Sequence, residues 1–289
     1  MSEWPVGLST GCFHHKNILD CLDQIQQGGF SLIEICSAPR HLDYHDRSAV
    51  EAAARRIREL KLEPYSFHAP FADHIDISNP DDHERSRAVQ EILTAAEAAA
   101  VLGVGYFVIH PGPERSGIPR EERLSRLENA ARDLNRVARR CIELGLGLVL
   151  ENMLPHLFAG HVRDLLWILG SLETTQVGIC LDTGHAFLSG DLATVVHKLS
   201  GHLWMVHAHD NWGKQDDHLP PGEASIDWRG LLGQLHRGGF HGAFILELSG
   251  NIPEHEVMAR AQEAQQYLRD VSRDVRLADL SGNPERSIR

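Results

Sequence analysis

The chain has 289 residues, of which 42% are hydrophobic and 24% charged, a composition that excludes an intrinsically disordered protein. Its formal net charge of -12 repels a phosphate backbone, which argues against a nucleic-acid partner while leaving open a locally basic groove. The chain lacks both a membrane-spanning apolar run and an N-terminal signal segment, so we expect a cytoplasmic protein with no membrane association.

Eight short apolar runs recur along the chain. They are Val6–Cys12, Leu32–Cys36, Pro64–His68, Tyr106–His110, Leu146–Glu151, Val177–Asp182, Leu203–His207 and Phe244–Glu247. The stretches between them, such as Ser48–Leu60, Glu84–Leu102 and Arg120–Leu144, repeat apolar residues every three or four positions, which predicts helices. Gly103 and Gly145 follow two of these helices, where a glycine C-cap is expected.

Strands that alternate with helices predict a parallel sheet. Eight such units, spaced about 34 residues apart on average, favour closure into a single (β/α)8 TIM barrel over an open sheet. We expect residues 1–268 to form this barrel, with the last helix ending near Leu268. The polar segment 269–289 is predicted to be a surface tail.

Six of the eight predicted strands end in a side chain that can bind a metal ion. These side chains are His68, His110, Glu151, Asp182, His207 and Glu247. The carboxyl ends of barrel strands converge on one face, so the six are expected to lie together. Three neighbouring buried carboxylates repel one another unless cations neutralise them. The pattern therefore predicts a site for divalent metal ions.

Three further residues extend this set. His185 follows Asp182 by three positions, and the loop after the seventh strand contributes Asp216 and His218. His209 lies two residues beyond His207 and faces the same side of an extended strand, so it is an alternative ligand at this position.

The loops after the strands supply candidate substrate contacts. Arg40 and Lys214 are the basic residues placed to meet a phosphate or a sugar hydroxyl, and Trp212 and Phe71 offer flat apolar faces to a sugar ring. The remaining loop histidines are expected to be solvated, although His14, His41 and His45 follow strands and could line the pocket rim.

The phrases FHAP, VIHPG, LEN, CLDTGHA, HAHDN, DDHLPPGEASIDW and LEL, in this order, resemble the xylose-isomerase-like TIM-barrel superfamily from about Val6 to about Leu268. This superfamily includes sugar isomerases and epimerases and the DNA-repair endonuclease IV. The resemblance implies that Glu151, Asp182, His207 and Glu247 hold one metal ion. It also favours His207 over His209, because a ligand histidine three residues before an aspartate is the family pattern.

Two functions follow from the resemblance. In the epimerases the two glutamates, here Glu151 and Glu247, pass a proton across a sugar or sugar phosphate, and His185 contacts the substrate; His68, Arg40, His209, Lys214 and Trp212 are further candidate contacts. In endonuclease IV, nine ligands hold three zinc ions for phosphodiester cleavage, and His68, His110, His185, Asp216 and His218 complete that set. We therefore expect one to three Mn²⁺, Zn²⁺, Mg²⁺ or Co²⁺ ions, a small carbohydrate-like substrate and a homodimer.

Overall fold

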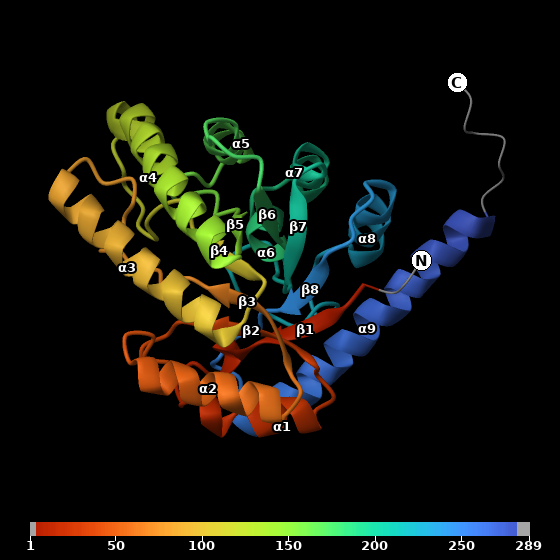
Figure 1. Ribbon diagram of the computed structural model, residues 1–289. Coiled ribbons are helices and arrows are strands. Elements are labelled where there is room, and N and C mark those ends of the chain that lie inside the picture. Colours follow the sequence, from red (N-terminus) through yellow and green to blue (C-terminus); the bar gives the residue numbers. More distant parts are fainter. Residues whose placement is uncertain (1–3, 282–289) are drawn as a thin grey trace.

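A computed structural model describes residues 4–281 and shows a closed barrel of parallel strands in sequence order, with the last strand paired to the first (Figure 1). The strands are β1 (Val6–Ser9), β2 (Leu32–Cys36), β3 (Glu63–His68), β4 (Tyr106–Ile109), β5 (Gly147–Glu151), β6 (Val177–Asp182), β7 (Leu203–Ala208) and β8 (Ala243–Leu246). The predicted (β/α)8 architecture is thus confirmed. Residues of the predicted tail beyond 281 lie outside the described part.

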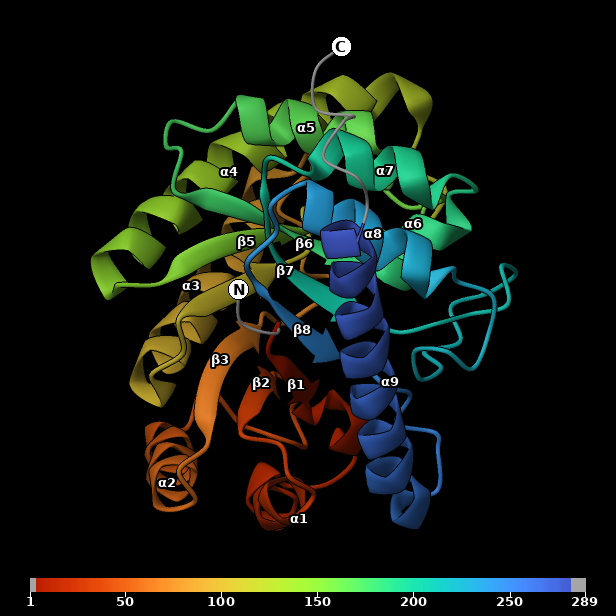
Figure 2. The same ribbon diagram turned by 90° about the vertical axis from the view of Figure 1, so that its right-hand side faces the viewer.

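Helices surround the barrel on all sides (Figure 2). They are α1 (Leu22–Gln27), α2 (Arg47–Glu59), α3 (Asp82–Leu102), α4 (Arg123–Leu144), α5 (Val162–Gly170), α6 (Thr183–Leu188), α7 (Leu192–Leu199), α8 (Trp228–Arg237) and α9 (Glu254–Ser281), with 3₁₀ turns η1 (Thr10–Phe13), η2 (Ile18–Asp20) and η3 (Arg120–Glu122). The main core packs between strands and helices, and a smaller group that includes Val108, Val149 and Met205 fills the barrel interior. Helices α3 and α4 end at Gly103 and Gly145 with φ of 81° and 75°, which confirms both predicted C-caps.

The first strand is shorter than predicted. We expected it to continue to Cys12, but β1 ends at Ser9, whose side chain accepts a hydrogen bond from the Gly11 amide. This cap turns the chain into η1, and the apolar residues of the turn remain buried. Burial of a 3₁₀ turn imitates the apolar pattern of a strand, which accounts for the error.

The last helix is longer than predicted. Instead of ending near Leu268, α9 continues to Ser281, and Val275 is buried against the barrel. Leu268, Val271 and Val275 are spaced by three and four residues, so the helical period persists through a polar-looking segment. Residues 269–281 therefore belong to the barrel's outer layer and are not a tail. None of the helices in residues 4–281 is long and apolar enough to cross a membrane.

His41 is not a solvated or rim residue. It is fully buried, and its Nδ1 donates to the carbonyl oxygens of Lys16 at 2.8 Å and Phe13 at 3.2 Å. Its Nε2 lies 2.9 Å from the Thr10 hydroxyl. The imidazole thereby ties the loop after β2 to the turn after β1, a structural role that the sequence position alone did not indicate.

Candidate metal centre

The carboxyl ends of the strands bring nine polar side chains together, and we call this group the strand-end cluster. Its members are His68, His110, Glu151, Asp182, His185, His207, Asp216, His218 and Glu247. Within it, Glu151, Asp182, His207 and Glu247 place one possible ligand atom each within 4.8 Å of one another. These four, predicted from the ends of separate apolar runs, come from β5, β6, β7 and the residue after β8.

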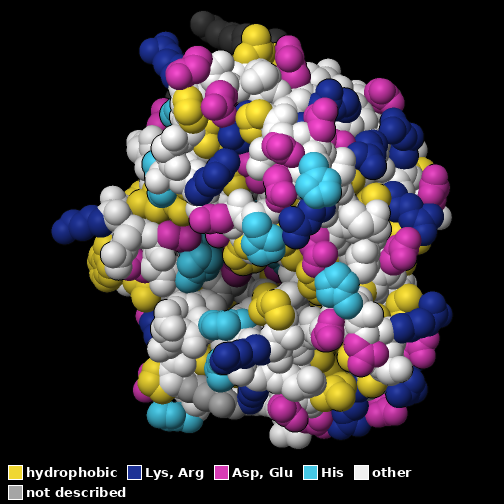
Figure 3. Space-filling model, turned by 90° about the vertical axis from the view of Figure 1, so that its left-hand side faces the viewer, with side chains coloured by type: hydrophobic (Ala, Val, Ile, Leu, Met, Phe, Trp, Pro, Cys, Tyr) yellow, Lys and Arg dark blue, Asp and Glu magenta, His cyan; other side chains and the backbone are white. Residues whose placement is uncertain are grey.

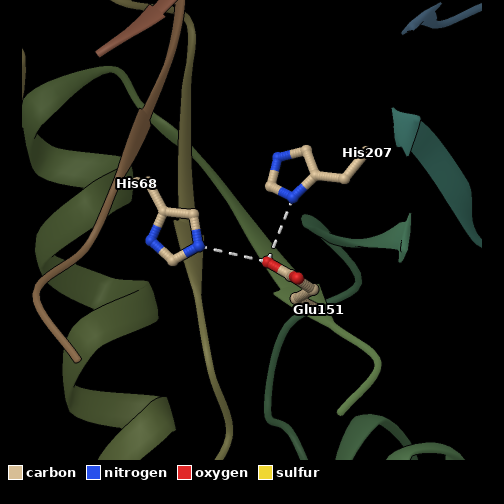
Figure 4. A group of neighbouring side chains, drawn as sticks. All are labelled: His68, Glu151 and His207. Atoms are coloured by element: carbon tan, nitrogen blue, oxygen red, sulfur yellow. Dashed lines mark ion pairs between the residues drawn. The ribbon is translucent and has the colours of Figure 1, made fainter. Parts of the chain in front are cut away.

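Two histidines approach Glu151, one from the end of β3 and one from the residue after β4, the strand beside β5. The Nε2 atom of His68 lies 3.3 Å from Glu151 Oε2, and Nε2 of His110 lies 3.5 Å from the same oxygen. Figure 4 shows His68 and His207 turned toward this carboxylate from opposite sides. Several imidazole nitrogens thus point at one carboxylate oxygen. A cation could lie between these nitrogens and the carboxylate.

A further group of ligands surrounds Asp216. Its Oδ2 lies 3.2 Å from Nε2 of His185 and 2.9 Å from Nε2 of His218. Asp216 and His218 belong to the loop after β7, and His218 has a left-handed φ of 47°. Asp210 anchors this loop by accepting hydrogen bonds from the amides of residues 222, 224 and 226 and from the Trp228 indole.

Backbone carbonyls set the orientation of three cluster histidines. Nδ1 of His68 donates to the carbonyl of Ala69, and Nδ1 of His218 donates to the carbonyl of Glu247, each at 2.9 Å. Nδ1 of His185 lies at the same distance from the Asn152 carbonyl. A carbonyl oxygen only accepts, so each ring carries a proton on Nδ1 and directs its Nε2 atom toward the cluster. Histidine ligands in metal sites are commonly held this way.

His207 and His209 occupy different places in the cluster. Nδ1 of His207 lies 3.2 Å from Glu151 Oε2 and 3.4 Å from Glu247 Oε2. His209 instead directs Nε2 to Asp182 Oδ2 at 2.8 Å and stacks on His218 with ring centroids 3.9 Å apart. The geometry thus groups His207 with both glutamates, whereas His209 forms a separate possible metal-ligand group with His218 and Glu247.

Glu34 is a buried carboxylate in contact with the candidate site that the sequence analysis missed. It lies in the middle of β2, fully buried, and its Oε2 is 2.9 Å from His207 Nε2 and 2.8 Å from the Ser66 hydroxyl. The one available signal was an acidic residue between apolar neighbours in the run LIEIC. A carboxylate behind a ligand histidine orients the ring and makes the other nitrogen a better ligand.

The electrostatics of the cluster suit a cation. Burial would raise the pKa of Glu151, but His207 and His110 outweigh it and hold the pKa well below its usual range. Burial would likewise lower the pKa of His110, but Glu151 and Glu114 outweigh it and raise the pKa to about 10. A divalent cation would take over the neutralisation of the carboxylates and release protons from the imidazoles.

Unsatisfied buried atoms provide a second test of fit. Among the described residues, Glu151 Oε2, His207 Nδ1, His209 Nδ1 and Asp216 Oδ1 are buried without a hydrogen-bond partner. Such atoms are costly in a folded protein unless something outside the chain satisfies them. The donor set of imidazoles and carboxylates matches Zn²⁺ or Mn²⁺ chemistry. The residues present therefore fit metal ions.

A cavity of about 350 Å³ opens beside the cluster. The cavity is lined by Phe71, by His14 and by the cluster residues His68, His218 and Glu247. His14 thus takes the alternative that the sequence left open, a place at the pocket rim. The Phe71 ring lies 5.0 Å from the ring of His68, between centroids. Viewed from the left-hand side of Figure 1, the surface is hollowed near its middle, with histidine and acidic side chains around the hollow (Figure 3). A cavity of this volume holds a small molecule.

Three other predicted substrate residues lie on loops, whereas the fourth, His209, is buried. Arg40 follows β2, whereas Trp212, which is 59% exposed, and Lys214 lie on the loop that carries Asp216. These three do not line the cavity beside the cluster, as far as the described residues go. Their role in substrate binding stays a prediction.

Known proteins share this barrel. The family model of the xylose isomerase-like TIM barrel matches residues 22–271. The crystal structure of a D-tagatose 3-epimerase-like protein is 25% identical, covers 95% of this chain and 99% of that one, and has a TM-score of 0.83. The IOLI protein, solved with a bound zinc atom, is 19% identical over 94% of this chain and 97% of its own, with a TM-score of 0.74. A probable endonuclease 4 of Nitratidesulfovibrio vulgaris is 33% identical over 172 residues, which are 58% of this chain and 59% of the relative.

Proposed function

Because the chain belongs to the xylose isomerase-like TIM-barrel family, we propose that it is a divalent-metal-dependent isomerase or epimerase. Its substrate would be a sugar, a sugar phosphate or a related polyol or keto compound. Glu151, Asp182, His207 and Glu247 would hold the ion, which supplies polarisation of the substrate carbonyl and so acidifies the adjacent C–H bond. The similarity to the D-tagatose 3-epimerase-like structure supports this substrate class.

The relation between Glu151 and Glu247 carries the proposal. Glu151 ends β5 and Glu247 follows β8, so they approach the same His207 nitrogen, at 3.2 and 3.4 Å, from different sides of the barrel mouth. Glu151 is almost fully buried, whereas the side chain of Glu247 is 20% exposed and lines the cavity. Glu247 lines the small-molecule cavity, and Glu151 lies behind it in the same group of ligand atoms. Two carboxylates beside one substrate would suit removal of a proton from a carbon and its return to the opposite face.

Each protein group then has a defined part in the reaction. One glutamate accepts the proton from the carbon next to the carbonyl, and the other donates a proton to the opposite face. His68 lines the cavity and would contact substrate oxygens, and His185 would do so from a neighbouring cavity, with orientations fixed by the carbonyls of Ala69 and Asn152. Phe71 shields one side of the cavity from water.

Isotope exchange tests the proposal. The metal-loaded protein is incubated in D2O with a panel of ketopentoses and ketohexoses, with and without a terminal phosphate, and deuterium at the carbon beside the carbonyl is measured by NMR. We expect exchange that falls about 10²- to 10⁴-fold in Glu247→Gln and Glu151→Gln. Glu128→Gln, an exposed change on α4, is the control. Exchange that survived both glutamate substitutions would refute the two-glutamate mechanism.

One observation favours a second function, an endonuclease IV-like phosphodiesterase. His185, Asp216 and His218 form a group of their own beside the four central residues, and His68 with Glu151 and His207 forms another. Several ions in one site would suit the clamping of both oxygens of a phosphodiester displacement. Cleavage of an abasic-site oligonucleotide, combined with about three retained ions per chain and no sugar exchange, would replace the first proposal with this one.

A further inference from the structure

A second cavity, with strongly basic walls, lies beside α4 and α5, which are neighbours in the barrel's outer layer (Figure 1). It measures about 320 Å³, and we call it the arginine cavity. Arg115, Arg120, Arg123 and Arg163 line it, with a single acidic residue, Asp164. Four arginines around one aspartate are a local reversal of charge in a chain with a formal net charge of -12.

The acidic neighbours only partly neutralise these arginines. Asp164 is buried and pairs with Arg123, and Nε of Arg163 lies at 3.8 Å from the same Asp164 oxygen. Arg115 reaches Asp76 Oδ2 at 3.4 Å. Among the described residues, the side chain of Arg120 has no hydrogen-bond or ion-pair partner. Arg123 and Arg163 thus share one carboxylate and Arg120 has none, so these three arginines leave two positive charges that are not neutralised.

Mutual repulsion of the arginines supports this description. The pKa of Arg123 is lowered from its usual range by partial burial and then by the positive charges of Arg163 and Arg120. Like charges in close proximity raise the free energy of the folded protein unless an anion lies between them. Guanidinium groups bind oxyanions through two parallel hydrogen bonds, and several of them match the many oxygens of a phosphate better than the two of a carboxylate.

We propose that the arginine cavity binds a phosphate group. His156 and His161 also line the cavity and can donate to the same anion. Helix α5 begins here at Val162 without a side-chain cap in the described structure, so its first amides add partial positive charge. The proposal does not depend on the sugar chemistry proposed above, because it concerns binding alone.

The position of the cavity indicates two sources for the phosphate. Ala159, His161 and Arg163 are shared with a neighbouring cavity of about 350 Å³, and that cavity reaches His185 of the strand-end cluster. A bound phosphate would therefore lie along a route to the cluster. It can belong to a small phosphorylated molecule or to the backbone of a nucleic-acid strand, and the two sources share the same recognition chemistry.

Calorimetric titration of the metal-loaded, full-length protein separates these sources. The probes are inorganic phosphate and a 15-base-pair DNA duplex, the latter at several salt concentrations. The test variant is Arg120→Gln with Arg163→Gln, and the control is Arg47→Gln with Arg87→Gln, exposed arginines on α2 and α3 whose loss changes the net charge equally. Phosphate bound at the metal ions would persist in both variants, so only loss in the test variant reports the arginine cavity.

We expect affinity for at least one probe to fall about tenfold or more in the test variant and to stay unchanged in the control. Loss for phosphate alone identifies a small phosphorylated ligand. Loss of affinity for the duplex identifies a nucleic-acid backbone. In that case the slope of log affinity against log salt concentration should also fall, by up to about two released counterions. Equal affinities in wild type and test variant, equal losses in both variants, or no binding of either probe would overturn the proposal.

Discussion

Glu34 on β2 and His207 on β7 are joined by a buried hydrogen bond of 2.9 Å between Oε2 and Nε2. The two strands are not neighbours in the sheet, so the bond crosses the barrel interior. Because the carboxylate accepts the Nε2 proton, the Nδ1 atom of His207 is left to face Glu151 and Glu247, where a cation bound between them would take its lone pair. The strength of His207 as a ligand therefore depends on a residue that lies outside the strand-end cluster.

Glu34→Gln is predicted to weaken metal binding. The amide removes the negative charge that makes His207 a better donor, and affinity at the tightest site should fall about 10- to 100-fold. Competition with a chelator of known affinity measures the loss. Glu63→Gln, an exposed change at the opposite end of the barrel, should leave affinity unchanged. Equal affinities for both variants would remove Glu34 from the site.

Asp216→Asn is predicted to lower the number of bound ions by one. Asp216 bridges His185 and His218, whereas the central group of Glu151 and His207 does not contain it. Plasma emission spectrometry after dialysis gives the metal count per chain. Asp217→Asn, at the next position, is the matched control and should keep the wild-type count. An unchanged count in Asp216→Asn would mean that the loop group holds no ion.

His41 is predicted to make stability depend on pH. Burial is the main cause that lowers the pKa of His41, to about 4 from an ordinary 6.5, against the opposing effect of the Lys16 and Phe13 carbonyls. The folded state thus favours the neutral ring, and its contribution is complete above pH 6.5 and is lost as the pH falls toward 4. The loss approaches about 3 kcal/mol at the lower limit.

Urea unfolding of metal-free protein between pH 7 and pH 4.5 measures this effect. The unfolding free energy of His41→Gln should decline less steeply with falling pH than that of the wild type. His83→Gln, which changes an exposed histidine, should follow the wild-type curve. Parallel curves for all three proteins would show that His41 does not titrate on unfolding.

Val275→Ala is predicted to destabilise the barrel by about 1 to 2 kcal/mol, because this side chain is 8% exposed and packs from α9 into the core. Leu277→Ala, two residues along, removes a side chain that is 58% exposed and should change the unfolding free energy by less than about 0.5 kcal/mol. Thermal and urea unfolding compare the two. Equal effects would mean that segment 269–281 adds nothing to the fold.

The strand-end cluster was predictable because, in a parallel barrel, the carboxyl ends of all strands lie on the same face. A residue at the end of an apolar run is therefore expected on that face, and Glu151, Asp182 and Glu247 could be placed together from their runs alone. Glu34 could not, because it precedes the end of its run. A charged residue within a strand can face either the barrel interior or the helices, and the register of pairing between neighbouring strands decides which. In this barrel Glu34 on β2 pairs with Ser66 on β3.

The arginine cavity was equally hidden in the sequence. Arg115 and Arg123 lie in and after the loop that follows β4, whereas Arg163 begins α5 some forty positions later. Sequence patterns report neighbours within one element, and a charge cluster drawn from two loops becomes visible only when α4 and α5 pack together. The end of α9 was mispredicted for a different reason. Beyond Leu268 its apolar residues are so widely spaced that the segment resembles a polar tail in sequence.

The loop between Asp210 and Leu219 has a wider consequence. It is pinned at its base by the bridge between these two residues, and it supplies both Asp216 and His218, while the remaining ligands come from strand ends and α6. An insertion or deletion confined to this hairpin would add or remove one coordination group without disturbing the barrel. We therefore expect the number of ions that the site can hold to depend on this ten-residue segment, separately from the stability of the barrel.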